Sequence, residues 1–315
     1  MRYVVTGSAG FIGSHLSERL LEKGHRVIGV DCFTDYYARE IKEQNLQGFL
    51  HHQNFKFFEV DLNTATLPEL LNQADGVFHL AAQAGVRASW GKSFQVYLDL
   101  NLLALQKILE ALKERGGPRL VFASSSSVYG DTDRFPTPET AAKRPLSPYG
   151  VTKLAGEALC DLYGHNYGLE IVSLRFFTVY GPQQRPDMAF HRFFRALLEG
   201  KPIRIFGDGQ QTRDFTFVAD IVEGTVAAME RGVPGRAYNL GGGNQRQLLD
   251  VIRLLAEVAG KDPVLEFEAP QKGDVRDTYA DNSLARKELG FEPKSDLKSG
   301  LVGELNWIKK HILHI

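Results

Sequence analysis

The chain has 315 residues, with 37 lysines and arginines against 38 aspartates and glutamates, and this balance excludes the basic surface that a nucleic-acid-binding protein needs. Hydrophobic residues make up 43% and charged residues 24%, which is typical of a globular protein and excludes general disorder. The chain has no run of about 18 apolar residues, no signal-peptide pattern and only two cysteines, Cys32 and Cys160. We therefore expect a cytoplasmic protein with neither a membrane span nor a disulfide scaffold.

Strands and helices are predicted to alternate along the first 175 residues. Ile12, Leu16 and Leu20 recur every four residues and predict a helix that ends near Gly24. Such alternation, with right-handed crossovers, gives a parallel sheet covered on both faces, so we predict an α/β fold with a doubly wound, Rossmann-type parallel sheet. Its strands are predicted from short apolar runs at residues 2–6, 27–30, 55–60, 76–80, 120–123 and 171–176.

The helix predicted after Ser93 is apolar over more of its surface than one sheet requires. Covering one face of a sheet needs about 100° of apolar surface. The extra width fits either a locally thick core or the same helix of a second subunit, and the second alternative predicts a homodimer. The main stripe comprises Leu98, Leu102, Leu105, Leu109 and Leu112, with a flank of Val96, Leu100, Leu103 and Ala104.

After about residue 177 the pattern becomes less regular, because glycines and prolines interrupt it repeatedly. Helical patterns remain at residues 190–199, 219–230, 248–259 and 283–289. We therefore predict two domains. The first comprises residues 1–176 and is rejoined by a segment near 214–240, and the second, smaller and mostly helical, comprises residues 177–315.

A glycine-rich turn joins the first predicted strand to the first predicted helix. Gly7, Gly10 and Gly13 permit a tight turn, a close approach of backbone to a pyrophosphate, and close packing of helix on strand. The helix N-terminus adds free N–H groups and the positive end of its dipole. Asp31 ends the second strand at the distance, about 20 residues, where an acid contacts a ribose. We predict a dinucleotide site that prefers NAD, since Asp31 would repel the 2′-phosphate of NADP.

The G-x-x-G-x-x-G spacing resembles the extended short-chain dehydrogenase/reductase family, which includes sugar-nucleotide epimerases and dehydratases, and the resemblance runs essentially end to end. Segments 61–62 and 79–82 also look like cofactor contacts of that family. The resemblance implies that residues 1–176 bind NAD and residues 177–315 bind a nucleotide sugar. The expected cofactor contacts are Gly7, Gly10, Phe11, Ile12, Gly13, Asp31, Asp61, Leu62, Leu80, Ala81, Ala82, Tyr149 and Lys153.

Tyr149 and Lys153 are the residues to which we assign the central chemistry. Ser147 can cap a helix whose first position suits Pro148. Tyr149 and Lys153, four residues apart, then share one helix face. An ammonium beside a phenol stabilises the phenolate, so we expect the pKa of Tyr149 to fall below its usual value of about 10. The phenolate would be a base that takes a hydroxyl proton while hydride leaves the same carbon.

A serine-rich segment, residues 124–127, follows the strand predicted at 120–123. By resemblance, Ser125 takes the place of the family's serine or threonine that hydrogen-bonds the reacting sugar oxygen; the alternative is a polar turn. Family dehydratases carry an Asp-Glu pair at the positions of Ser126 and Ser127, and decarboxylases carry a Glu matching Ser127. Because an ordinary serine hydroxyl cannot remove the C5 proton or eliminate water, the resemblance implies oxidation at C4 followed by reduction, which is epimerisation.

Residues 175–190 look like the signature of the UDP-glucuronate 4-epimerase subgroup, and segments 32–37 and 82–87 resemble it too, so Arg87 is expected to contact substrate. UDP-glucose epimerases usually have Asn where this chain has Thr178. A guanidinium offers a carboxylate two parallel charge-assisted bonds. We therefore assign Arg185 to the C6 carboxylate, with Thr178, Ser126 and Ser127; the alternative is that Arg185 is a surface arginine.

Arg213 and Arg276 lie in glycine-bearing loops of the second half. By resemblance they embrace the diphosphate of UDP, where two positive charges match two negative ones. Either residue alone could be a solvated arginine. The nine histidines show no metal-ligand spacing, so no metal site is expected.

These observations lead us to expect an NAD-dependent C4 epimerase of a UDP-sugar, with UDP-glucuronate preferred as substrate. The nearest alternative substrate is UDP-glucose or UDP-N-acetylglucosamine, which Arg185 disfavours because a neutral C6 group gives a buried arginine no counter-charge. An alternative of another class is a non-catalytic NAD-binding protein, which has no need of Tyr149 and Lys153.

Overall fold

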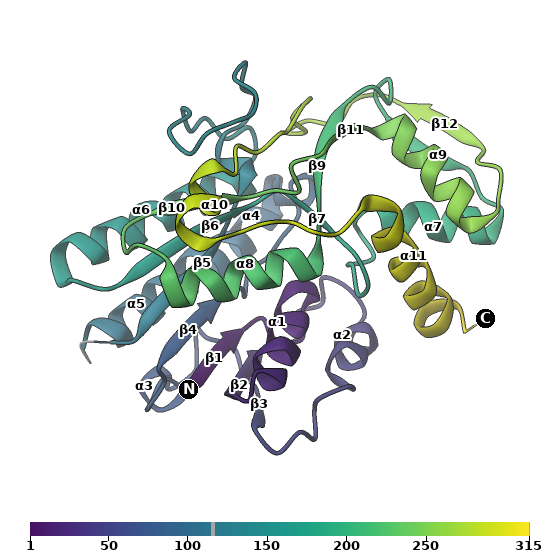
Figure 1. Ribbon diagram of the computed structural model, residues 1–315. Coiled ribbons are helices and arrows are strands. Elements are labelled where there is room, and N and C mark those ends of the chain that lie inside the picture. The colour runs from purple at the N-terminus through teal and green to yellow at the C-terminus, as the bar shows by residue number, and fades with distance from the viewer. Residues whose placement is uncertain (115–116, 315) are drawn as a thin grey trace.

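The computed structural model describes residues 1–114 and 117–314, and residues 115–116 and 315, which fall within the two predicted domains, lie outside the described part. Its main feature is a parallel seven-stranded sheet in the order β10-β6-β5-β4-β1-β2-β3 (Figure 1). The strands are β1 (Arg2–Thr6), β2 (Arg26–Asp31), β3 (Phe55–Glu59), β4 (Gly76–His79), β5 (Arg119–Ser125), β6 (Ile171–Phe176) and β10 (Ala237–Leu240).

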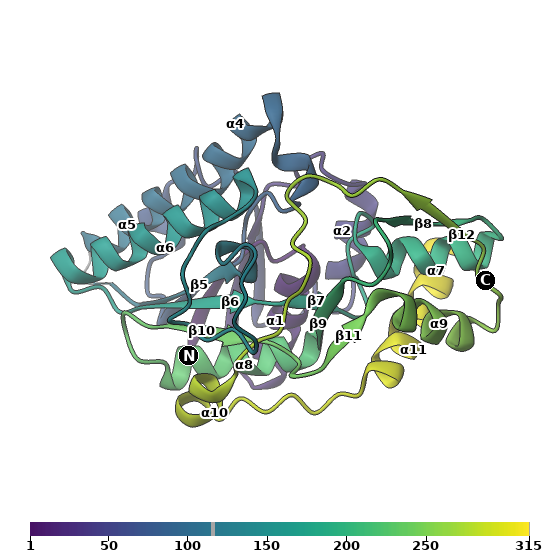
Figure 2. The same ribbon diagram turned by 90° about the horizontal axis from the view of Figure 1, so that it is seen from above.

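Two helical layers cover the sheet, as Figure 2 shows from above. The side chains of β1 alternate, so Val5 packs toward α1 (Phe11–Glu22) and α8 (Val218–Arg231), whereas Val4 packs toward α5 (Ala104–Lys113) and α6 (Pro148–Tyr167). The predicted doubly wound α/β fold is therefore confirmed. Strand order reverses at β1, which pairs with β2 on one side and β4 on the other. In such sheets ligands bind at this switch point, beyond the carboxyl ends of the strands.

The helix predicted after Ser93 is not a regular α-helix. It comprises α4 (Phe94–Tyr97), a π-helical segment (Leu98–Leu103) and α5. Of the main stripe, Leu105, Leu109 and Leu112 in α5 are fully buried, whereas Leu98 and Leu102 in the wider π turns are half-buried, and Leu103 of the flank is 43% exposed. A spacing argument that assumes 3.6 residues per turn cannot detect this change.

The second half contains more strand than the sequence predicted. A three-stranded sheet comprises β7 (Thr178–Tyr180), β9 (Thr212–Phe217) and β11 (Gln245–Gln247), and a two-stranded sheet comprises β8 (Ile203–Phe206) and β12 (Leu265–Glu268). These strands of three to six residues are too short for a clear alternation. The accompanying helices are α7 (Ala189–Glu199), α9 (Leu248–Ala259), α10 (Ser283–Leu289) and α11 (Leu297–Ile308).

The two halves of the chain interlock. From the second half, α8 covers the large sheet and β10 pairs with β6, while α7, α9 and α11 share a separate apolar cluster (Figures 1 and 2). The domain boundary near residue 176 stays a prediction. Two short helices remain, α2 (Arg39–Leu46) and α3 (Leu67–Leu70). In residues 1–114 and 117–314, no helix combines the length and apolar character needed to cross a membrane.

Candidate active site

The glycine turn between β1 and α1 brings backbone groups closer together than side chains would permit. Gly7 has a φ of +72°, and a Cβ on Gly13 would lie 2.0 Å from the carbonyl oxygen of Gly7. Gly10 precedes α1 without any side-chain cap, so the first N–H groups of that helix keep their hydrogen-bonding capacity. A bare, positively polarised helix N-terminus in a glycine cradle fits a pyrophosphate.

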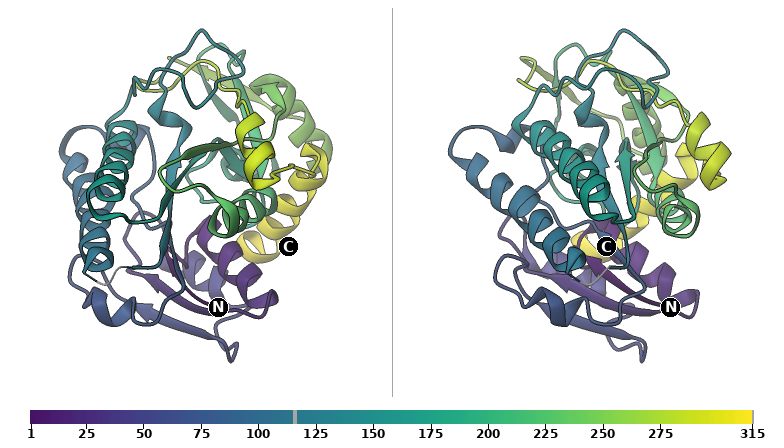
Figure 3. Two further views of the ribbon diagram at one scale, coloured as in Figure 1. Left: turned by 60° about the vertical axis from the view of Figure 1, so that its left-hand side comes forward. Right: turned by 90° about the vertical axis from the view of Figure 1, so that its left-hand side faces the viewer.

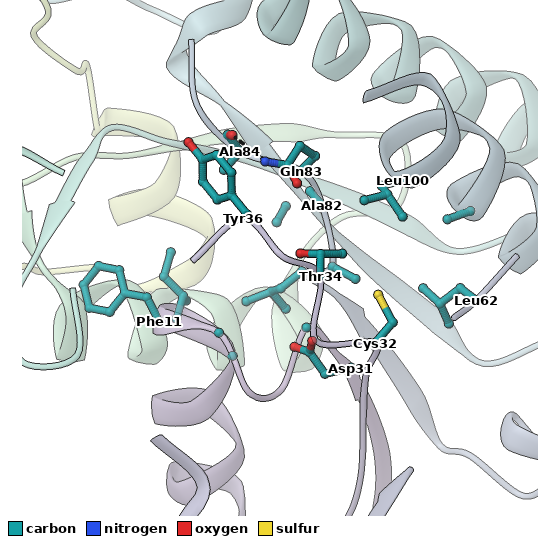
Figure 4. A pocket seen from close by; sticks show the side chains of 18 of the residues that line it. Phe11, Asp31, Cys32, Thr34, Tyr36, Leu62, Ala82, Gln83, Ala84 and Leu100 are labelled. Atoms are coloured by element: carbon teal, nitrogen blue, oxygen red, sulfur yellow. Dashed lines mark hydrogen bonds between the residues drawn. The ribbon is translucent and has the colours of Figure 1, made fainter. Parts of the chain in front are cut away.

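Asp31, at the end of β2, has its carboxylate oriented by backbone groups. Oδ2 accepts a hydrogen bond from the Ala9 N–H at 3.2 Å, and Oδ1 accepts one from the Phe33 N–H at 2.9 Å. Figure 4 shows Asp31 and Tyr36, from the stretch at the end of β2, and Leu100, from the π-helical segment, around one pocket. The ammonium of Lys42, a residue that no sequence motif singled out, lies 3.5 Å from Oδ1 of Asp31.

Every expected cofactor residue lines this one cavity, which lies at the switch point of the sheet. The residues in question are Gly7, Gly10, Phe11, Ile12, Gly13, Asp31, Asp61, Leu62, Leu80, Ala81, Ala82, Tyr149 and Lys153. The cradle, the bare helix terminus and the carboxylate of Asp31 together fit a dinucleotide. Leu100, which the sequence placed only in the apolar flank of the helix after Ser93, reaches the cavity from the π-helical segment.

We predict that Gly13→Ala destabilises the protein by about 1–3 kcal/mol and prevents stabilisation by NAD, because the added methyl group meets the Gly7 carbonyl. Thermal unfolding with and without NAD measures both effects. Gly164→Ala is the matched control, since its Cβ would meet nothing nearer than 3.4 Å and alanine favours α6. Equal unfolding temperatures and equal NAD shifts for Gly13→Ala and the wild type would contradict the prediction.

Tyr149 and Lys153 share one face of α6, as the sequence predicted. Ser147 caps this helix by accepting a hydrogen bond from the Gly150 N–H at 3.1 Å, and Pro148 is its first residue. The Lys153 ammonium donates to the Ala123 carbonyl oxygen at 2.7 Å and lies 5.9 Å from the centre of the Tyr149 ring. The helix thus holds the phenol and the ammonium side by side at the cavity wall.

The charge balance around Tyr149 differs from the expectation. Burial raises the pKa of Tyr149, and a hydrogen bond with Ser125 and the charge of Arg185 oppose that rise. Burial also lowers the pKa of Lys153 to about 8, against the opposing effects of Cys160 and Glu157. The predicted lowering of the phenol's pKa by Lys153 is therefore wrong for the chain by itself. The groups that favour the phenolate here are Ser125 and Arg185.

A second cavity, of about 830 Å³, adjoins the first. Tyr149 and Arg185 line both cavities, so they form part of the wall where the two meet. Arg192, Arg204 and Phe206, which the sequence analysis did not select, also line the second cavity. Of the expected residues, the structure brings together here Ser125, Ser126, Ser127, Thr178, Arg87, Arg185 and Arg213.

Arg276 is placed apart from the expected group. It lines a neighbouring cavity and pairs with Asp208 at 3.2 Å, and its side chain is 61% exposed. Arg213 lines the second cavity and also the neighbouring cavity that Arg276 lines. Its guanidinium donates to the carbonyl oxygens of Thr212, Val275 and Arg276. The expected embrace of a diphosphate by Arg213 and Arg276 stays a prediction.

Arg185 already has an anionic partner within the chain. Its Nε and Nη2 each donate to a different carboxylate oxygen of Asp187 at 3.0 Å, and the Tyr36 hydroxyl donates to Oδ2 of Asp187 at 3.1 Å. Only 22% of the Arg185 side chain is exposed, which does not fit a surface arginine. The expectation that a neutral substrate leaves Arg185 without a counter-charge is wrong, because Asp187 supplies one.

At the second cavity, Arg87 from the first half of the chain contacts side chains of the second half. Its guanidinium pairs with Asp274 at 2.6 Å and lies 4.1 Å above the centre of the Phe206 ring. All three side chains line the cavity. Arg87 thus lines the second cavity while paired with Asp274, and its expected contact with substrate stays a prediction.

Comparison with known proteins gives consistent results. A model of the NAD dependent epimerase/dehydratase family matches residues 3–241. An uncharacterized UDP-glucose epimerase of Bacillus subtilis is 46% identical over 312 residues, covering 98% of each chain. A UDP-glucuronate 4-epimerase of Thermodesulfobacterium geofontis is 41% identical over 314 residues, covering 98% of this chain and 97% of the relative. The crystal structure of UDP-glucuronic acid 4-epimerase from Bacillus cereus, in complex with UDP-glucuronic acid and NAD, is 44% identical and superposes with a TM-score of 0.96, covering 98% and 99% of the two chains.

Proposed function

The chain belongs to the NAD dependent epimerase/dehydratase family, and from this premise we propose that it interconverts UDP-glucuronate and UDP-galacturonate by epimerisation at C4. The observation that carries the proposal is the position of Tyr149, on the wall shared by the cavity that fits a dinucleotide and the larger cavity lined by arginines and serines. A base in that place reaches a sugar hydroxyl from the side of the cofactor.

Tyr149 takes the proton of the C4 hydroxyl, and Ser125, hydrogen-bonded to the phenol, steadies the same oxygen. Bound NAD supplies the acceptor, and later the donor, of the C4 hydride. Lys153, whose ammonium lies 5.9 Å from the centre of the Tyr149 ring, holds the end of β5 beside the phenol through the Ala123 carbonyl oxygen. The 4-keto sugar then turns so that the opposite face of C4 is reduced, and return of the proton from Tyr149 completes the cycle.

Arg185 suits the C6 carboxylate of a uronate. With Asp187 bound to Nε and Nη2, the Nη1 group remains for a second carboxylate. Thr178, Ser126 and Ser127 line the same cavity and offer hydroxyl donors. Oxidation at C4 makes a β-keto acid, which loses CO₂ when its C5–C6 bond aligns with the carbonyl π system. A clamp that keeps this bond near the ring plane suppresses that loss.

The direct test is incubation of the purified protein with UDP-glucuronate and with UDP-glucose separately, with products resolved by NMR. We expect UDP-galacturonate from the first substrate and a lower kcat/KM for the second. An absence of UDP-galacturonate at any enzyme concentration would overturn the proposal for uronates. If neither UDP-glucuronate nor UDP-glucose gave a product, the assignment as a UDP-sugar epimerase would be overturned.

Epimerisation of a neutral UDP-hexose is the second candidate function, and one observation favours it. Asp187 neutralises Arg185 before any substrate binds, so a C6 hydroxymethyl group would leave no unpaired buried charge. Turnover of UDP-glucose or UDP-N-acetylglucosamine faster than of UDP-glucuronate would favour this candidate. The binding-only alternative is not favoured, because Tyr149, Lys153 and Ser125 lie near one another in the structure, an arrangement that a binding-only protein does not need.

We also propose that the protein forms a homodimer through the outer faces of α5 and α6 and the helical segments before α5. These helices lie side by side as an outermost layer (Figure 3). Their outward side chains form an apolar face that is 43–54% exposed, comprising Val96, Leu103, Val151, Leu162 and Tyr167. Patches of this kind on a soluble protein mark interaction surfaces.

We propose the cytoplasm as the location of the protein, because Cys32 and Cys160 are both free.

We predict that Leu162→Glu converts the dimer to a monomer, because a carboxylate buried in an apolar interface would lose its water. Light scattering after size-exclusion chromatography should give twice 35.1 kDa for the wild type and 35.1 kDa for the variant. Val264→Glu, which changes a somewhat more exposed apolar residue outside this face, is the control and should stay dimeric. A monomeric wild type, or a dimeric Leu162→Glu variant, would refute the interface.

A further inference from the structure

Helix α6 holds the end of β5 through three side chains spaced one turn apart. Tyr149, Lys153 and Glu157 lie four residues apart, and so share one face of the helix. The Tyr149 phenol is hydrogen-bonded to Ser125, and the Lys153 ammonium donates to the carbonyl oxygen of Ala123. In the third contact the donor is on β5: the Ser124 hydroxyl donates a hydrogen bond to Oε1 of Glu157 at 2.6 Å. Three successive turns of α6 therefore hold three successive residues of β5.

Glu157 is itself fixed by Arg175 on the neighbouring strand. Arg175 donates from Nε to Oε1 at 2.8 Å and from Nη2 to Oε2 at 2.7 Å, so the pair is bidentate. The two side chains are only 6% and 2% exposed. Ser124 and Arg175 are register partners in the parallel pair β5–β6, which is why both reach the same carboxylate. Glu157 is thus the point at which α6, β5 and β6 are tied together.

The pair is also connected beyond the helix. The remaining Nη1 of Arg175 donates to the Tyr129 hydroxyl at 2.8 Å and to the Glu139 carbonyl oxygen at 2.9 Å. The Tyr129 hydroxyl in turn donates to the Asn239 amide oxygen on β10 at 2.6 Å. A network with every member hydrogen-bonded in a buried site has one geometry, whereas apolar contacts tolerate small sliding movements.

We propose that the buried Glu157–Arg175 pair is a positioning device for the reaction: it sets the register of α6 on β5 and thereby holds Tyr149 and Lys153 against Ser125. The inference rests on the proposed C4 epimerisation, because it assigns Tyr149 the role of base. A displacement of about 1 Å at a reacting group can lower a rate about 100-fold. Neither Glu157 nor Arg175 lines the cavities, so their effect on the reaction is transmitted through the helix.

The decisive variant is the double replacement Glu157→Leu with Arg175→Met. Removing both charges together avoids an unpaired buried ion, so the fold should persist. We expect kcat for UDP-glucuronate to fall about 30–100-fold, with KM within about threefold of the wild type and a somewhat lower unfolding temperature, because the Ser124 hydroxyl and the Glu139 carbonyl lose their partners. A kcat equal to that of the wild type in a folded double variant would show that the pair acts only on stability and would overturn the proposal.

Ser124→Ala keeps the ion pair but breaks its link to β5, and it serves if the double variant does not fold. We expect kcat to fall about 5–10-fold without loss of stability, and an unchanged kcat would likewise overturn the proposal. Glu170→Gln is the matched control, because it breaks a pair with Arg119 at the opposite end of β5 and should leave kcat unchanged. Wild-type protein that converts neither UDP-glucuronate nor UDP-glucose would instead overturn the proposed function, and this inference with it.

Discussion

Replacing Tyr149 by Phe is expected to lower kcat for C4 epimerisation by about 10²–10⁴-fold, the range associated with loss of a positioned acid–base group. The change removes one oxygen atom and leaves the ring in place against Tyr97, whose centre lies 6.3 Å away. Binding of NAD and of UDP-glucuronate should therefore change little. Steady-state kinetics with calorimetric titration of both ligands separate the two effects.

Tyr167→Phe is the matched control for this experiment. Tyr167 is the last residue of the same helix, is 54% exposed and does not line either cavity. Its replacement should leave kcat unchanged. A Tyr149→Phe variant with more than a tenth of wild-type activity would contradict the role of the phenol as base and require another proton acceptor.

Replacing Arg185 by Ala is expected to lower kcat/KM for UDP-glucuronate by at least about 100-fold. Two charge-assisted hydrogen bonds contribute about 1.5–3 kcal/mol each, and 1.36 kcal/mol corresponds to a factor of ten. The 4-keto uronate, a β-keto acid, should also leak CO₂ from the variant and leave a UDP-pentose. Turnover of UDP-glucose should fall less, because its C6 group carries no charge.

Mass spectrometry of the products, together with kinetics on both substrates, tests this prediction. Arg195→Ala is the control, since Arg195 is 46% exposed on α7, pairs with Glu199 and lines neither of the two cavities that meet at Tyr149. Unchanged uronate kinetics without a pentose product would count decisively against the clamp. Equal losses on UDP-glucuronate and UDP-glucose would indicate that Arg185 supports the fold of the site instead.

The contrast between Arg185 and Arg276 shows that sequence motifs can select arginines but cannot predict which partners they have in the folded chain. Both were selected from loop motifs as anion-binding arginines. The structure places Arg185 between the two cavities with Asp187 and Tyr36, and places Arg276 in a neighbouring cavity with Asp208. Asp187 is only two residues from Arg185, yet nothing in the sequence distinguishes an ion pair there from two independent side chains.

Features that depend on residues near one another in the chain could be predicted from the amino-acid pattern. The alternation of apolar runs predicted the parallel sheet, the spacing of Gly7, Gly10 and Gly13 predicted the cradle, and the four-residue spacing of Tyr149 and Lys153 placed both on one helix face. Backbone geometry and local periodicity enforce these features whatever surrounds them.

Contacts between side chains that are far apart in the sequence became visible only in the folded chain. The contact of Lys42 with Asp31, the position of Leu100 in the π-helical segment and the tie between Glu157, Ser124 and Arg175 join separate segments. The same packing buries Tyr149 and raises the pKa that local reasoning expected to fall. Burial and long-range pairing result from how the layers fit together, and no spacing along the chain encodes that fit.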